Sequence, residues 1–303
     1  MKRLRISIVE YLNTAPLVWG FVDGPLAGKY DLSFTVPSQC AEALHRGDAD
    51  VAIIPSIEYQ RMDGMVVLPG MAIAAKREVR SLLVVSKRPI DRAKRIALDT
   101  SSRSTAGLVR ILAKEYWGIQ PEFVDAAPDP VEMLKSADAA LVIGDPALRI
   151  SLKMEALAGK TPDSGGCCEG DPEEMPVPGF ETLFVYDVSH QWREMTNRPS
   201  VLAIWAANKG VVSTEVVADF LTSKRYGVER IRDISEAASI KLDLPPRALE
   251  RYLTENIQFD LDDENLAGLE LYFEKAAAHG LIPRARAVEF ARAASDSAVR
   301  RGA

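Results

Sequence analysis

Cysteine and histidine are both scarce in this chain of 303 residues, which holds three of each. The cysteines are Cys40, Cys167 and Cys168, an odd number with two of them adjacent, so the chain lacks the pattern of a disulfide framework. No Cys/His spacing of the zinc type occurs, and neither G-x-S-x-G nor H-E-x-x-H is present. We therefore expect reduced thiols, as in a cytoplasmic protein, and chemistry that needs neither a metal nor a cofactor.

Long apolar runs are absent too. No segment approaches the roughly 18 consecutive apolar residues that a membrane-spanning helix needs. The N-terminal segment MKRLRISIVEYL begins with basic residues, but its apolar run is short, is interrupted by Glu10 and lacks a small-residue cleavage site. This segment is therefore predicted to be a first β-strand rather than a secretory signal, and we expect a soluble, cytoplasmic protein.

An excess of positive charge is also absent, because 37 basic and 43 acidic residues give a net charge of −6. The two signs are intermixed without a basic block, so nothing indicates a surface for nucleic acid or for an anionic membrane. If the ligand is an anion, local geometry has to attract it.

The pattern of the sequence is an alternation of strands and helices, which is typical of α/β folds. Strands are predicted at 5–12, 31–37, 50–56, 65–75, 79–90, 94–99, 121–126, 139–145 and 201–208. Helices are predicted from Pro16, at 38–47, 104–118, 130–137 and 146–157, and through most of the chain after Val211. The Gly- and Pro-rich segment 158–179, which contains Cys167 and Cys168, is predicted to be a mobile surface loop.

The length favours two lobes, because single cores stop growing at about 250–300 residues. The alternating pattern restarts after Pro89 and is followed by a return strand. We therefore expect lobe 2, residues 89–202, to be inserted into a discontinuous lobe 1 of residues 1–88 and 203–303. The predicted crossings lie near 82–90 and 200–206, and a ligand is expected between the lobes at the carboxyl ends of strands.

Polar residues recur where a predicted strand gives way to a predicted helix. These are Asn13, Thr14, Ser38, Ser56, the run 100–105 and Asp145. Strand ends in open α/β sheets face one crevice, where the N–H groups and positive dipoles of helix N-termini attract carboxylate or phosphate. The alternative for each residue is that it only caps its helix. The run 100–105 favours binding more strongly, because one cap needs one hydroxyl and this run offers five beside Arg103.

Five segments within residues 5 to about 275 resemble the successive blocks of one enzyme family. They are SIVEYLNTAPLVWG, SQCAEALHRGDADVAIIPSIEYQR, LDTSSRSTAGLVRIL, AALVIGDPAL and VSHQWREMTNRPSVLAIWAA. In this order they are similar to the chorismate dehydratase family of the futalosine route to menaquinone. The resemblance implies a type II periplasmic-binding-protein-like fold, with a ligand cleft between two α/β lobes, and a lyase that converts chorismate to 3-[(1-carboxyvinyl)oxy]benzoate and water.

The resemblance also implies a set of site residues. Asn13, in the Leu12-Asn13 motif, is the expected catalytic contact to the reacting part of the substrate. The expected substrate-binding residues are Ser56, Ser81, Ser102, Ser104, Thr105, Gly144 and Asp145. The loop 158–179 and the pair Ser189-His190 depart from the family pattern, but both lie outside the matched pocket segments. The implied partner is the small-molecule substrate alone, and the oligomeric state is not indicated.

A substrate-assisted elimination is the mechanism that these residues favour. Asp145 is the one carboxylate at a matched position, and its place at a helix start ties it to backbone amides. The enolpyruvyl carboxylate of the substrate, held by Asn13 and hydroxyl donors, is therefore the expected base.

Two other functions remain open from the sequence. One is 1,4-dihydroxy-6-naphthoate synthase, which shares the fold and for which the resemblance implies a histidine base in lobe 2, where His190 is the only candidate. The other is a cytoplasmic solute-binding protein without catalysis. His45 and His279 precede glycines closely and are expected at helix C-termini, where a cation complements the helix dipole.

Overall fold

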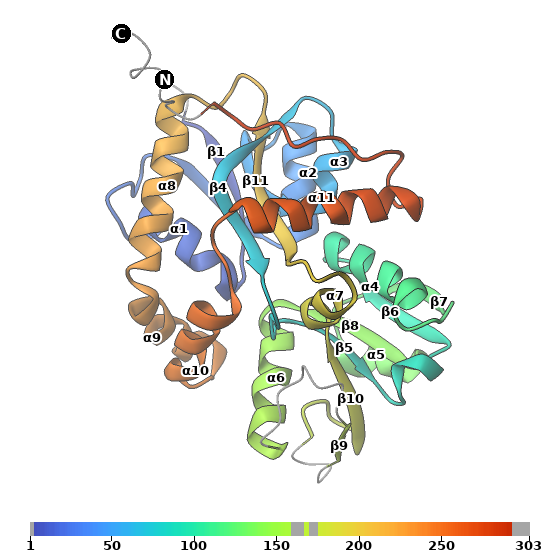
Figure 1. Cartoon of the computed structure of the whole chain (residues 1–303). Coiled ribbons are helices and arrows are strands. Elements are labelled where there is room, and N and C mark those ends of the chain that lie inside the picture. The colour runs from blue at the N-terminus through green and yellow to red at the C-terminus, as the bar shows by residue number, and fades with distance from the viewer. Residues whose placement is uncertain (1–2, 159–166, 170–174, 293–303) are drawn as a thin grey trace.

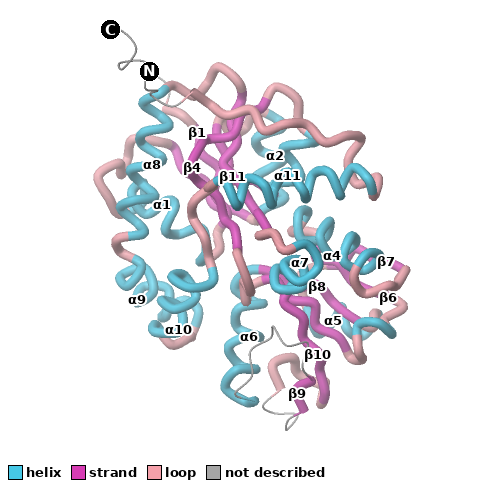
Figure 2. The backbone as a smooth tube through the Cα atoms, viewed as in Figure 1, coloured by secondary structure: helices cyan, strands magenta, loops and turns pink. Residues whose placement is uncertain are grey.

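A computed structural model describes residues 3–158, 167–169 and 175–292 of the chain. These residues form two α/β lobes, and the chain passes between the lobes twice (Figure 1). Each lobe is built around one β-sheet, with helices packed against it (Figure 2). The two-lobed α/β architecture expected from the sequence is confirmed.

The sheet of lobe 1 has five described strands in the order β2-β1-β3-β11-β4. Their bounds are β1 (Arg5–Val9), β2 (Asp31–Thr35), β3 (Val51–Pro55), β4 (Met65–Ala75) and β11 (Ser200–Asn208). β1 is parallel to β2 and β3, whereas β11 is antiparallel to β3 and β4. Every residue of β3 is buried, because neighbours cover both of its faces, and this explains its unbroken apolar sequence VAIIP.

The sheet of lobe 2 has six described strands in the order β7-β6-β8-β5-β10-β9. Their bounds are β5 (Leu82–Ser86), β6 (Arg95–Asp99), β7 (Glu122–Ala126), β8 (Ala139–Ile143), β9 (Cys167–Glu169) and β10 (Thr182–Asp187). β6 is parallel to β7 and β8, and β5 runs antiparallel between β8 and β10. The carboxyl ends of β6 and β8 therefore lie at the same edge of the sheet, where α4 and α6 begin.

Helices connect and cover the strands. They are α1 (Ala15–Val22), α2 (Pro37–Arg46), α3 (Ser56–Arg61), α4 (Arg103–Glu115), α5 (Pro130–Ser136), α6 (Gly144–Ala158), α7 (Val188–Thr196), α8 (Thr214–Val228), α9 (Ile231–Leu242), α10 (Pro246–Arg251) and α11 (Asp263–Ala278). Short 3-10 turns η1 (Leu12–Thr14) and η2 (Ile90–Arg92) and a π-helical turn η4 (Tyr252–Asn256) complete the described elements. α4 of lobe 2 packs against α3 and α11 of lobe 1, so helix packing joins the lobes in addition to the two crossings of the chain (Figure 1).

The larger apolar core is shared by both lobes. Leu82 and Val84 of β5 belong to this core, whereas the alternate residues Leu83 and Val85 belong to a second core within lobe 2. Successive side chains of a strand point to opposite faces, so one face of the second sheet is directed toward lobe 1. The first core therefore holds the lobes together.

The crossings between the lobes lie at 76–81, between β4 and β5, and at 197–199, between α7 and β11. The lobe boundary predicted at residue 88 falls after β5, and the boundary predicted at 202 falls inside β11. β5 pairs in the second sheet and β11 in the first, so both boundaries move toward the N-terminus. The boundary predicted at 202 lies within the apolar run 201–207, and only the pairing of the strands shows that this whole run belongs to lobe 1.

The segment 158–179 differs in part from the predicted loop. Cys167–Glu169 form strand β9, which pairs antiparallel with β10, while 159–166 and 170–174 lie outside the described residues. β10 and α7 occupy a stretch for which the sequence predicted no element. Their signals are short, and the Gly- and Pro-rich neighbouring sequence obscures them.

Candidate active site

A cavity of about 50 Å³ lies between the two lobes. Five of the predicted site residues line it: Asn13, Ser102, Ser104, Thr105 and Gly144. All but Gly144 have polar side chains, and all five residues are buried. This volume is far below the roughly 300–1,000 Å³ of a pocket that holds a small molecule. The lobes are therefore closed on each other in this structure.

Asn13 reaches the cavity from η1, the short turn between β1 and α1. Pro16 follows within the first turn of α1, where a missing N–H costs nothing. The Asn13 side chain is 7% exposed, and its Oδ1 accepts a hydrogen bond from the Thr14 hydroxyl at 3.4 Å. Neither Asn13 nor Thr14 caps α1 through its side chain.

The start of α4 supplies the hydroxyl groups from lobe 2. Ser102 occupies the N-cap position, yet its side chain makes no capping hydrogen bond. Helix starts elsewhere in the described chain do have such caps: Asp129, Asp187, Ser213 and Asp262 each accept from first-turn N–H groups. The capping alternative is therefore not realised at Ser102, and its hydroxyl is available to a ligand.

Ser104 uses its hydroxyl across the lobe boundary. Its Oγ accepts a hydrogen bond from the Ile57 backbone N–H at 3.2 Å and lies 3.1 Å from the Ser56 Oγ. The Ser56 hydroxyl donates to the Val201 carbonyl at 2.7 Å and does not line the cavity. Ser104 of lobe 2 therefore holds the first turn of α3 in lobe 1, and Ser56 supports that contact from behind.

Ser81 and Asp145 also lie beside the cavity rather than in its lining. The Ser81 carbonyl accepts from the Gly144 N–H at 2.8 Å, and its hydroxyl accepts from Tyr252 at 2.8 Å. Asp145 accepts from the Leu12 N–H at 3.0 Å and lines a neighbouring, mainly apolar pocket. Burial raises the pKa of Asp145, and the hydrogen bond from Leu12 opposes that shift.

Gly144 is required at its position for two reasons. Its φ is +67°, a backbone conformation that favours glycine, and a Cβ built on it would stand 2.8 Å from the ring of Tyr11. Tyr11 of lobe 1 thus packs directly on the backbone of lobe 2. Burial raises the pKa of Tyr11, against a hydrogen bond with Ser101 that lowers it.

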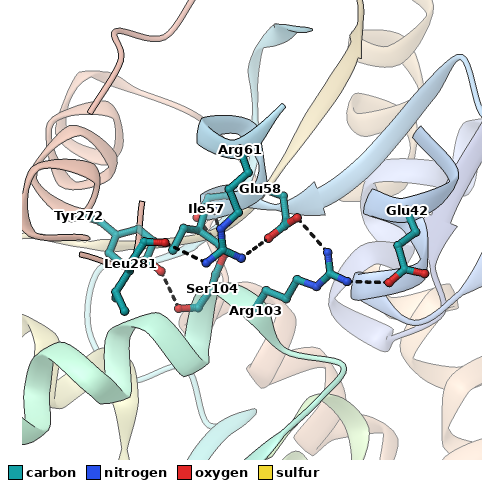
Figure 3. Close-up of polar contacts among 9 residues, drawn as sticks. Glu42, Ile57, Glu58, Arg61, Arg103, Ser104, Tyr272 and Leu281 are labelled. Carbon is teal, nitrogen blue, oxygen red and sulfur yellow. Dashed lines mark hydrogen bonds and ion pairs between the residues drawn. The ribbon is translucent and has the colours of Figure 1, made fainter. Parts of the chain in front are cut away.

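A chain of charged residues joins the two lobes beside the cavity. Figure 3 shows Arg103 of lobe 2 between two carboxylates of lobe 1, at 2.9 Å from Glu58 and 2.6 Å from Glu42. Glu58, whose side chain is 7% exposed, also binds Arg61 at 2.7 Å. In the same view Tyr272 of α11 donates to the Ser104 carbonyl at 2.8 Å. We call Glu42, Glu58, Arg61 and Arg103 the charged clasp.

The sequence did not single out Tyr11, Glu58 or Tyr252 as site residues. Tyr11 and Glu58 lie within the segments that carry the family resemblance, but nothing in a sequence indicates that they face another lobe. The three histidines all belong to the described chain, and none of them lines the cavity. No three His, Cys, Asp or Glu side chains of the described residues gather closely enough to hold a metal ion.

Comparisons with known proteins agree with this architecture. The model of a family described as menaquinone biosynthesis matches residues 4–278. The chorismate dehydratase of Thermus thermophilus is 27% identical over 276 residues, which are 90% of this chain and 95% of that enzyme. None of the described helices is both long and apolar enough to cross a membrane.

Solved structures support the fold. A protein of Archaeoglobus fulgidus superposes with a TM-score of 0.68 at 18% identity, over 92% of this chain and 98% of that one. The periplasmic aliphatic sulphonate binding protein of Escherichia coli gives a TM-score of 0.59 at 14% identity, over 96% and 92% of the two chains. The expected periplasmic-binding-protein-like fold is confirmed. Because the family model matches more than half of its residues, this chain belongs to the menaquinone biosynthesis family.

Proposed function

We propose that this protein is a chorismate dehydratase, a hydro-lyase that converts chorismate to 3-[(1-carboxyvinyl)oxy]benzoate and water in the futalosine pathway. The observation that carries the proposal is the similarity to the Thermus thermophilus enzyme, which extends through both lobes and 90% of the chain. The small-molecule substrate is the only partner that the proposal needs. A cytoplasmic location, expected from the sequence, forms part of the same proposal.

The polar groups around the cavity suit this substrate. Chorismate carries two carboxylates and a ring hydroxyl, and the cavity offers the amide of Asn13 with the hydroxyls of Ser102 and Thr105 from opposite lobes. The start of the 13-residue helix α4 adds a positive dipole end, which favours an anion without net positive charge. Because the cavity of about 50 Å³ is far smaller than the roughly 300–1,000 Å³ of a small-molecule pocket, the lobes have to separate before chorismate enters.

The elimination requires that one ring C–H bond and one C–O bond break. The proton beside the enolpyruvyl ether leaves, the neighbouring hydroxyl departs, and the ring becomes aromatic. Asp145 is held by the Leu12 N–H and does not line the cavity, so the enolpyruvyl carboxylate is the better-placed base. That carboxylate takes the ring proton, the C–H electron pair forms the new ring double bond as the C–O bond breaks, and the carboxylic acid returns the same proton to the departing hydroxide, which leaves as water. Asn13 orients the carboxylate, and lobe closure excludes bulk water.

The test is to incubate the purified protein with chorismate alone and to follow the product by absorbance and mass. Loss of one water to give the enolpyruvyl benzoate supports the proposal. Chorismate that binds but is recovered unchanged favours a binding protein without catalysis. Turnover of cyclic dehypoxanthinyl futalosine instead favours 1,4-dihydroxy-6-naphthoate synthase, which the absence of a cavity-lining histidine among the described residues counts against.

Asn13→Ala tests the role of the amide. We expect kcat to fall by about tenfold or more, because an orienting hydrogen bond to the reacting group is lost. Asn208→Ala removes the same group at the carboxyl end of β11, outside the cavity lining, and is expected to leave kcat unchanged. Full turnover by Asn13→Ala contradicts this version of the mechanism.

A further inference from the structure

Tyr252 connects two of the predicted site residues from inside lobe 1. Its side chain is 1% exposed, and its hydroxyl donates to the Ser81 Oγ at 2.8 Å. The Asn13 side chain lies near the same phenol group and lowers its pKa, which is the effect of a hydrogen-bond donor. A single buried hydroxyl therefore binds Ser81, at the end of the first crossing, and lies near Asn13 of η1.

The direction of these hydrogen bonds follows from the chemistry of the groups. Asn13 lowers the pKa of Tyr252, which a donor does and an acceptor does not, so the amide presents its N–H₂ group to Tyr252. The phenol O–H donates its one hydrogen bond to the Ser81 Oγ, and the lone pairs of the phenol oxygen face that amide. The Ser81 hydroxyl consequently accepts from Tyr252 and keeps its own proton, for which the described residues offer no acceptor.

The backbone around Tyr252 holds this arrangement in place. Tyr252 begins η4, a π-helical turn of the kind that is frequent at functional sites. At the other end of η4, the Asn256 side-chain N–H₂ donates to the Glu78 carbonyl at 3.3 Å. Both ends of the turn therefore bind the first crossing, 76–81. Burial raises the pKa of Tyr252, so the phenol stays protonated and remains a donor throughout the neutral range.

We propose that Tyr252 is a positioning residue of the dehydratase site: it holds Ser81, which lies behind the cavity lining in this closed form, so that the remaining Ser81 proton meets the substrate once the lobes have opened to admit it. This inference rests on the proposed function. It deepens it by assigning Ser81 the role of donor, either to a substrate carboxylate or to the departing hydroxyl. A residue that acts in this way affects the rate of the chemical step more than it affects the binding of chorismate.

The first experiment compares Tyr252→Phe with the wild type in steady-state turnover of chorismate. The substitution keeps the ring and its packing and removes one hydroxyl. We expect kcat to fall about tenfold and KM to change less than about threefold, because the lost hydrogen bond matters in the transition state. Tyr30→Phe is the matched control, because Tyr30 is also buried, donates to Asp219 and lies away from the cavity. Its kcat is expected to equal that of the wild type.

The second experiment combines Tyr252→Phe with Ser81→Ala, which tests the same hydrogen bond from its other partner. If Tyr252 acts through Ser81, the double variant has the kcat of Ser81→Ala alone. If the double variant loses kcat by the product of the two single losses, Tyr252 does not act through Ser81. An unchanged kcat for Tyr252→Phe overturns the inference as a whole. A wild type that does not convert chorismate shows instead that the proposed function has failed. Thermal unfolding of each variant confirms that the rates refer to folded protein.

Discussion

Two side chains of lobe 2 hold backbone N–H groups of lobe 1 in this structure. Ser104 accepts from Ile57, and Asp145 accepts from Leu12. Both N–H groups belong to first turns, of α3 and η1, where no carbonyl of the same turn satisfies them. Separation of the lobes frees these donors, and a substrate carboxylate is the kind of acceptor that can replace Ser104 and Asp145.

Gly144 offers a test of how tightly the lobes meet at one residue. Gly144→Ala introduces a strained φ and a clash with the Tyr11 ring, whereas Gly118→Ala introduces only the strain, because nothing lies within 4 Å of a Cβ there. We expect urea unfolding to show a loss of about 1–2 kcal/mol for Gly118→Ala. The clash should add about 1–3 kcal/mol for Gly144→Ala. Equal losses in the two variants contradict direct packing of Tyr11 on Gly144.

Among the elements, α4 has the most varied set of contacts. Its start lines the cavity, its flank packs on α3, α7 and α11, and its Arg103 belongs to the charged clasp. At the end of α4, Glu115 binds Lys275 of α11, and it also binds His279, which directly follows α11, at 2.6 Å. Movement of lobe 2 away from lobe 1 therefore breaks contacts at both ends of this one helix.

Glu58→Gln tests the charged clasp. The change leaves Arg61 and Arg103 without the carboxylate that both share, so we expect a loss of about 1–3 kcal/mol in the free energy of unfolding. Small-angle scattering of the free protein should show a larger radius of gyration than for the wild type, because the closed form loses an interlobe contact. Glu132→Gln is the control, since its pair with Lys135 is exposed at 64% and 60% and is worth at most about 1 kcal/mol. Identical scattering from Glu58→Gln and wild type argues against a role in closure.

For the whole molecule, the crossings decide how the lobes can move. Asp187 is completely buried and accepts N–H groups from Val79 and Arg80 in the first crossing and from Ser189 and His190 at the start of α7. Arg80 has a φ of +63°, which is uncommon for a residue with a Cβ, and Asp187 holds it there. Asp187 thus links the first crossing, where the chain leaves lobe 1, to α7, after which the chain returns to lobe 1.

Acid is expected to weaken the contact between the lobes. Burial raises the pKa of Glu115, but hydrogen bonds from Lys275 and His279 outweigh it, and the net shift is downward from 4.5. A lowered pKa contributes stability above the unfolded-state value, and this stability is lost as pH falls through the folded-state value. The free energy of unfolding should therefore fall on acidification below about pH 4.5. The free energy of unfolding should fall less steeply with falling pH in Glu115→Gln than in the wild type. Equal slopes in the two proteins would show that Glu115 does not cause the loss of stability in acid.

Much of the site followed from local patterns. Asn13, Ser102, Ser104 and Thr105 stand where strands give way to helices, and such junctions in an α/β fold meet at one edge of a sheet by geometry alone. Ser56 and Asp145 stand at similar junctions, and Ser81 directly precedes β5, yet their polar atoms bind neighbouring backbone or Tyr252. A sequence places a side chain at a junction, but the neighbouring lobe decides whether it faces a cavity.

By itself, the sequence determined most of the elements, the α/β class and the two lobes, because these follow from hydrophobic periodicity, turn residues and chain length, which are local or additive properties. Only the tertiary structure decided where the lobes exchange, that Cys167–Glu169 form a strand, that Glu58 joins arginines of both lobes, and that Tyr252 contacts Ser81 from 171 positions away. The physical reason is that hydrogen bonds and ion pairs between distant segments depend on which surfaces the folded cores bring together, and no local pattern records that choice.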